Sequence, residues 1–130
     1  ASWTYTTATI RASNNASANS LTVFQGLAEE FYDLGFAQRV SPSMGNTTST
    51  GQTGLGWNST TAKSGMYGTV GHNTGSGTDV HRGNAIARFL QVPSLGINVV
   101  TALENAVEAN GTITWFGGED DMVLSAIWRG

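Results

Sequence analysis

Apolar side chains return every three or four positions in two parts of the chain. In the first part the stripe runs from Leu21 to Leu34, with Ser20 placed as an N-cap and Gly35 as a C-terminal stop. In the second part the same spacing runs over 97–107 and follows a proline and a serine. This spacing, with these end residues, predicts two amphipathic helices.

Other segments are rich in β-branched and aromatic residues and contain no glycine or proline, which predicts strands. They cover Ser2–Arg11, Phe36–Val40, Asn84–Val92, Thr112–Phe116 and Met122–Trp128. The last two are separated by the five residues 117–121, a connection length typical of a hairpin. The elements together predict an α+β fold, a small single domain over residues 1–130 with two amphipathic helices packed on a mainly antiparallel sheet.

The central segment 41–84 differs from both flanks because it holds ten of the 17 glycines and many threonines and serines. Connections inside a compact domain are much shorter, so the segment predicts an extended arm or hairpin insertion. It carries isolated apolar and aromatic side chains that a flexible linker does not need. We expect them to form an oligomer interface with a neighbouring copy, and the alternative is that they pack back onto their own domain: Leu55, Trp57, Met66, Tyr67 and Val70.

Charge and cysteine content exclude several classes of protein. Only 12% of the residues are charged and the net charge is −3, so the clustered basic face of a nucleic-acid-binding protein is not expected. The chain has no cysteine, which excludes disulfides, thiolate metal sites and thiol nucleophiles. No apolar run approaches the 18 residues of a membrane-spanning helix, so no membrane span is expected.

Few residues suggest chemistry. His72, Asp79 and His81 are the types that form a two-histidine, one-carboxylate metal site, but they lie in a glycine-rich segment where such residues also form turns. Glu119–Asp121 offers three adjacent carboxylates, which a solvated turn explains without catalysis. Motifs for a nucleophile or a phosphate loop are missing. The sequence therefore predicts a protein that is not an enzyme, with no catalytic residue, no cofactor and no resident metal.

A second class of function is carbohydrate binding, in which exposed aromatic rings stack on sugars and polar side chains bind the hydroxyl groups. The rings that this lectin-like or receptor-binding alternative would use are Trp3, Tyr5, Trp57, Tyr67, Trp115 and Trp128. Such aromatic residues are also common in cores and protein interfaces.

The low charge and the central segment favour self-assembly, because one contact repeated around an axis closes a ring of identical subunits. In composition the chain resembles small structural proteins of tailed bacteriophages, such as head decoration, head-to-tail and tail proteins, although no specific motif carries this resemblance. It implies a virion component, assembled in the host cytoplasm, whose partners are copies of itself and other virion proteins. The carbohydrate-binding alternative implies a glycan as the partner.

Overall fold

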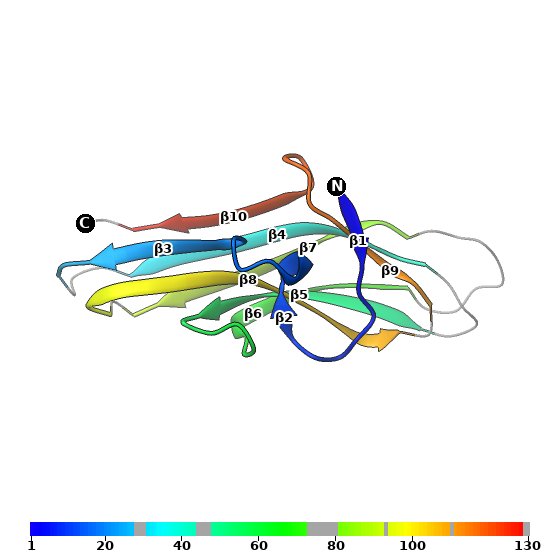
Figure 1. Ribbon diagram of the computed structural model, residues 1–130, viewed down its shortest axis with the longest axis horizontal. Helices are drawn as coiled ribbons and strands as arrows, with labels where there is room; N and C mark the ends of the chain where they lie inside the picture. The colour runs from blue at the N-terminus through cyan, green and yellow to red at the C-terminus, as the bar shows by residue number, and fades with distance from the viewer. Residues whose placement is uncertain (28–30, 44–47, 73–80, 93, 110, 129–130) are drawn as a thin grey trace.

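The structure is a computed structural model that describes residues 1–27, 31–43, 48–72, 81–92, 94–109 and 111–128 (Figure 1). Almost all regular structure in this part of the chain is β-strand. Ten strands and one short 3₁₀ helix, η1, follow in the order β1 Ser2–Thr4, β2 Arg11–Ala12, η1 Ser13–Asn15, β3 Ser20–Gln25, β4 Tyr32–Pro42, β5 Ser49–Trp57, β6 Ser64–His72, β7 Gly83–Gln91, β8 Gly96–Ala109, β9 Ile113–Phe116 and β10 Met122–Ile127.

The predicted α+β fold is wrong, because both predicted helices are strands. The first apolar stripe belongs to β3 and to the beginning of β4, and the second belongs to β8. In β8 the side chains that face the interior include Asn98 and Glu104, while Ile97 and Val107 on the strand are exposed. Along β8, apolar residues therefore do not alternate with polar residues as in a strand with one buried face. Their spacing of three to four positions is instead the spacing expected of a helix.

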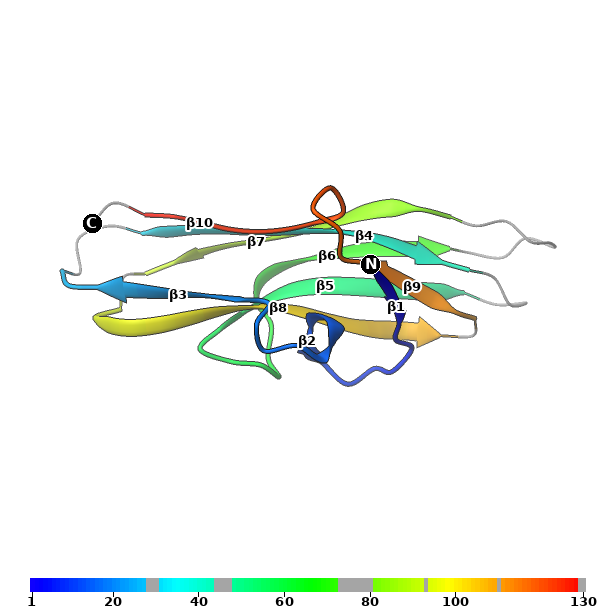
Figure 2. The ribbon, with the colours of Figure 1, turned by 45° about the horizontal axis from the view of Figure 1, so that its top comes forward.

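The strands form one antiparallel sheet in the order β1-β9-β4-β7-β6-β5-β8-β2, with β10 also paired to β4 and β3 also paired to β8. The sheet curves strongly into a half-barrel, so that β4 and β7 face β5 and β8 across the core (Figure 2). The curve passes through β6, where Gly68 lies so close to β7 that an added Cβ would be 2.2 Å from the nitrogen of Ile86. Glycine at this position allows the two strands to cross.

The central segment is not an arm. Its strands β5 and β6 form an antiparallel pair in the middle of the sheet, with Ser49 opposite His72 and Thr53 opposite Gly68. β5 also pairs along its whole length with β8. Glycines within these two strands, such as Gly51, Gly56 and Gly68, lie where an added Cβ would meet a neighbouring residue at 2.9 Å or less. The predicted extended insertion is therefore part of the body of the sheet.

The two C-terminal strands exist as predicted, but they do not pair with each other. β9 pairs with the end of β4, with Trp115 opposite Val40, and β10 pairs with the beginning of β4, with Ile127 opposite Asp33. They therefore follow one another along the same edge of β4, and residues 117–121 form a loop between them. The predicted strand over 84–92 is confirmed as β7, whereas the predicted strand over 2–11 reduces to β1 and the first residue of β2.

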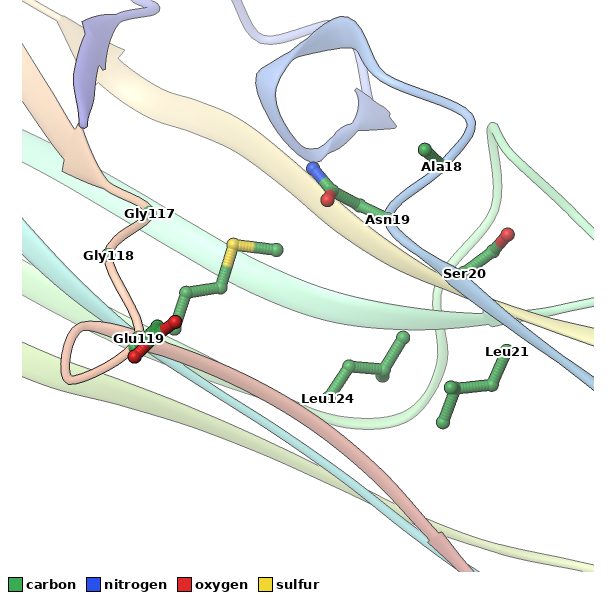
Figure 3. A pocket seen from close by; sticks show the side chains of 9 residues that line it. Ala18, Asn19, Ser20, Leu21, Gly117, Gly118, Glu119 and Leu124 are labelled. Carbon is green, nitrogen blue, oxygen red and sulfur yellow. The ribbon is translucent and has the colours of Figure 1, made fainter.

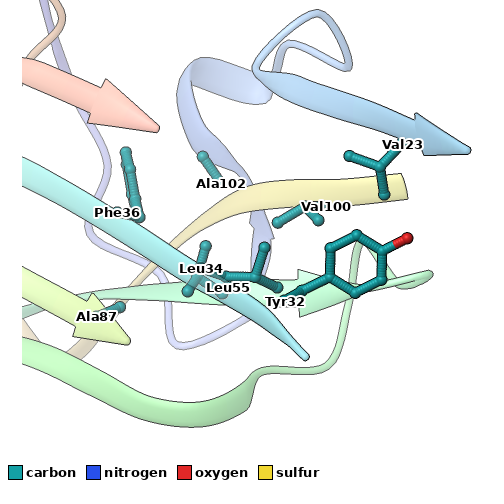
Figure 4. Packing of buried hydrophobic residues seen from close by; sticks show 8 residues of the cluster. All are labelled: Val23, Tyr32, Leu34, Phe36, Leu55, Ala87, Val100 and Ala102. Atoms are coloured by element: carbon teal, nitrogen blue, oxygen red, sulfur yellow. The ribbon is translucent and has the colours of Figure 1, made fainter. Parts of the chain in front are cut away.

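The core consists of two clusters between the facing strands. In the first, Tyr32, Leu34 and Phe36 alternate along β4 and pack on Leu55 of β5 and Val100 of β8 (Figure 4). The second cluster contains Val40, Ile113 and Trp115, together with side chains from β6, β7 and β8. The two-residue period of β4 is the clearest match between sequence pattern and burial in the molecule.

Candidate functional site

One end of the molecule is covered by exposed apolar side chains. It is the end where β3 and β10 finish and β4 and β8 begin, at the left of Figures 1 and 2. Nine large side chains there are between 41% and 70% exposed, and we call them the apolar end: Phe24, Leu27, Phe31, Leu90, Val92, Leu95, Ile97, Ile127 and Trp128.

The strand register brings these residues together from four parts of the sequence. Phe24 on β3 lies directly opposite Ile97 on β8, and both side chains point away from the core. Leu90 on β7 and Ile127 on β10 both lie opposite Asp33 of β4, one on each side of that strand. The remaining members lie in or next to the connections at this end.

Buried polar side chains hold the two connections that carry Leu27 and Leu95. The Gln25 amide donates to the carbonyl oxygen of Leu27 and its side-chain oxygen accepts from the Tyr32 hydroxyl. In the other connection, Asn98 Nδ2 donates to the carbonyl oxygen of Ser94 at 2.7 Å. These polar groups are buried and bonded, so they fix the backbone beneath the apolar side chains. A surface ordered in advance loses less conformational entropy when it binds.

The apolar end is larger than the apolar patches of typical monomers. If each side chain exposes on the order of 100 Å², the nine together expose roughly 900 Å². The largest patch on a typical monomer is about 300–600 Å², and each partner of a stable protein complex buries about 800 Å². On the neighbouring strands β4 and β7, Asp33 and Arg88 form an exposed ion pair at 3.3 Å. The apolar area exposed at this end is therefore of the size that one partner of a protein complex covers.

A groove of about 470 Å³ joins the apolar end to the outer face of β6 and β7. Its lining includes Met66, Phe89 and Leu90, with the Asp33–Arg88 pair at its rim. Met66 lies opposite Arg88 in the sheet, and Tyr67 beside it is exposed. The structure thus places these two residues of the sequence-predicted interface next to the apolar end.

The other three residues of the predicted interface lie inside or against the core. Leu55 and Val70 are buried in the first and second core clusters. Trp57 is half-buried and its ring centroid lies 5.2 Å from that of Tyr32. These three side chains therefore pack onto their own domain, which is the alternative given from the sequence.

Sequence reasoning missed part of the apolar end because it assigned Phe24, Leu27, Phe31 and Ile97 to helices. Phe24, Leu27 and Phe31 formed the stripe that predicted the first helix, so they were expected to be buried. Their exposure follows from β3 having Leu21 and Val23 on its inner face and Phe24 on its outer face. No signal in this stretch alone distinguishes the two arrangements.

A buried polar network near the middle of the core ties the N-terminal segment to β8. Glu104 has no exposed side-chain surface and accepts from Arg11 Nε at 2.9 Å, from Trp3 Nε1 at 2.9 Å and from Ser13 Oγ at 3.3 Å. Burial raises the pKa of Glu104 above its ordinary value, although Arg11 and Trp3 act in the opposite direction. Because these partners, with the backbone of Asn14, lie in residues 3–14, the network has a structural role, holding that segment in place.

A second cavity, of about 360 Å³, lies at the seam where the edges of β3 and β10 approach each other (Figure 3). Leu21 and Leu124 lie near one another on its two sides, and Asn19, Ser20 and Glu119 add polar groups. The three carboxylates predicted as a turn lie in the loop between β9 and β10, where Asp121 forms a 2.7 Å ion pair with Arg39.

The six aromatic residues of the carbohydrate alternative do not all lie on one surface. Trp115 is fully buried, and Trp3 donates to the buried Glu104. Tyr67 and Trp128 are exposed, but they belong to β6 and to the residue after β10, strands that are not neighbours in the sheet. Trp57 and Trp128 both lie against the buried Tyr32, at 5.2 Å and 6.0 Å between ring centroids, so of the six rings these two are brought to the same residue.

Two of the three residues weighed from the sequence as candidate metal ligands lie side by side. The ring centroids of His72 and His81 are 5.9 Å apart, with the ring planes at 73°. Asp79 lies outside the described residues. Within the described ranges, no three histidine, aspartate or glutamate side chains gather closely enough to hold a metal ion.

No family model matches this chain, and neither a curated protein nor a solved structure matches it. In the part of the chain that the structure describes, no helix has the length and apolar character needed to cross a membrane.

Proposed function

We propose that this protein is a non-enzymatic structural protein that assembles with copies of itself through the apolar end. The observation that carries the proposal is the roughly 900 Å² of exposed apolar side chain at one end of the sheet, held on a fixed backbone. Covering this area on assembly removes it from water, the main favourable term in protein association. A second copy is the occupant because the surface matches the area of one side of a stable interface.

We further propose that the assembly is a virion component of a tailed bacteriophage, as a head decoration, head-to-tail or tail protein. Its support is the cysteine-free, weakly charged composition, which resembles such proteins. The genes that flank the coding sequence test this part: neighbours that encode capsid or tail proteins support it, and a metabolic operon contradicts it. Carbohydrate binding stays the alternative prediction, and two of its six rings are not available to a sugar as placed: Trp115 is buried and Trp3 donates to Glu104.

The native mass tests self-assembly. We expect the 13.6 kDa chain to sediment as a defined oligomer at about 100 μM, and the double variant Phe24→Thr/Ile97→Thr to sediment as a monomer. Threonine keeps the strand propensity of both positions and removes the cross-strand apolar pair. The matched control is Val107→Thr, an exposed apolar residue near the other end of β8, which should leave the mass unchanged.

Two results would contradict the proposal. One is a wild-type protein that sediments as a monomer at this concentration. The other is a double variant that keeps the wild-type mass while urea unfolding shows that both proteins are folded. Because the substituted side chains are exposed, we expect the urea midpoint to change little.

A further inference from the structure

The His72–His81 pair lies at the end of the sheet opposite the apolar end. His72 is the last residue of β6 and His81 lies two residues before β7, so both imidazoles are carried by neighbouring strands. His72 is half-buried and His81 is exposed. These are the only two histidines of the chain.

The separation of the rings fits two ligands of one metal ion. A histidine nitrogen binds Zn²⁺ at about 2.0–2.1 Å, which places the ion about 3.2 Å from the ring centroid. Two centroids 5.9 Å apart then subtend an angle of about 130° at the ion. A tetrahedral angle requires a centroid separation of about 5.2 Å, so binding needs each ring to turn one nitrogen toward the ion and the two rings to approach by less than about 1 Å.

Two charged groups lie in the part of the sheet that carries the pair. The guanidinium of Arg82, next to His81 in the chain, lies over the ring of Phe116 on β9, at 5.8 Å from its centroid. On β8, Glu108 is opposite Thr50 of β5, and Thr50 is in turn opposite Gly71 of β6. A carboxylate therefore lies two strands from the histidine end of β6, and contributes negative potential without being a ligand.

We propose that His72 and His81 together bind one divalent transition-metal ion of borderline softness, such as Zn²⁺ or Ni²⁺. Imidazole nitrogen selects these ions over Mg²⁺ and Ca²⁺, which require oxygen ligands. Water completes the coordination shell. The site rests on the ring geometry alone and is independent of the apolar end, so it stands whether or not the chain assembles with itself.

Titration of the tag-free full chain with Zn²⁺, followed by calorimetry, tests the site. We expect saturable binding that Ca²⁺ does not compete, and a dissociation constant raised about tenfold or more by either His72→Asn or His81→Asn. Asn84→Ser on β7 is the matched control and should change it less than about twofold. Far-UV circular dichroism confirms that each variant is folded.

Three outcomes would overturn the proposal. The first is no Zn²⁺ binding up to about 1 mM. The second is binding that persists unchanged in either histidine variant, since the proposed site needs both rings. The third is equal competition by Ca²⁺, which would indicate oxygen ligands elsewhere on the chain.

Discussion

Replacing Glu104 with alanine should destabilise the fold strongly, because it removes the shared acceptor of the buried polar network. Arg11 would lose a 2.7 Å ion pair, and Trp3 Nε1 and Ser13 Oγ would lose their carboxylate acceptor. Breaking a buried ion pair by removing one partner costs about 3–5 kcal/mol. This is a large part of the roughly 5–15 kcal/mol by which a domain is stable. We therefore expect Glu104→Ala to lower the free energy of unfolding by about 3 kcal/mol or more.

Urea unfolding at pH 7, followed by tryptophan fluorescence and by circular dichroism, measures this loss. Glu108→Ala is the matched control, because Glu108 lies on the same strand and is exposed, and its loss should cost less than about 0.5 kcal/mol. A loss below about 1 kcal/mol for Glu104→Ala would refute the role of the network in stability.

The pH dependence of stability provides a second measurement of the same carboxylate. Burial raises the pKa of Glu104 in the folded state above its value in the unfolded chain, which is about 4.3. At a pH between these two pKa values, the folded chain keeps a proton on Glu104 that the unfolded chain has lost. Stability should therefore fall as pH rises through this window. Glu104→Gln cannot titrate and should remove that fall, and an unchanged profile in this variant would contradict the assignment.

Two further predictions concern other contacts. Gly68→Ala should cost about 3 kcal/mol or more, because the new Cβ would meet the backbone of Ile86 at 2.2 Å. Gly96→Ala, at φ +93° with no atom within 4 Å of the new Cβ, should cost only about 1–2 kcal/mol. If urea unfolding shows a larger loss of stability for Gly96→Ala than for Gly68→Ala, the close approach of β6 and β7 is contradicted. Burial lowers the pKa of Lys63 to about 8, so stability should rise between pH 8 and its ordinary value near 10.5, where only the unfolded chain keeps the proton. Lys63→Met should remove this rise, measured as the urea midpoint at each pH. If the midpoint rises equally with pH in both proteins, Lys63 does not cause the rise.

Some of the fold could be predicted because its pattern is local. The run over 84–92 carries β-branched and aromatic residues between breakers, and it forms β7. The pairing of strands could not be predicted in the same way. β9 and β10 have the spacing of a hairpin, yet both find a better partner in the long strand β4. That choice depends on contacts between residues about 75 to 95 positions apart, which no local window contains.

The candidate site was harder to predict than the fold. Met66 and Tyr67 were expected to be exposed and are, whereas Leu55 and Val70 from the same segment are buried. All four have apolar side chains in glycine-rich surroundings, so residue type alone does not separate them. Val70 faces the core from the second half of β6, whereas the consecutive residues Met66 and Tyr67 in its first half are both exposed, so position along the strand decides as well as the face.

The amino-acid sequence by itself determined which chemistry is available to this protein. Without cysteine and with few charged residues, it has no disulfide, no thiolate site and no extended basic face. Only the tertiary structure decided that the apolar stripes are strands, that Glu104 is buried, and that Phe24 and Ile97 meet on an outer face. The physical reason is that a strand acquires its buried face from its neighbours in the sheet. A short apolar run is therefore compatible with either structure until long-range pairing selects one.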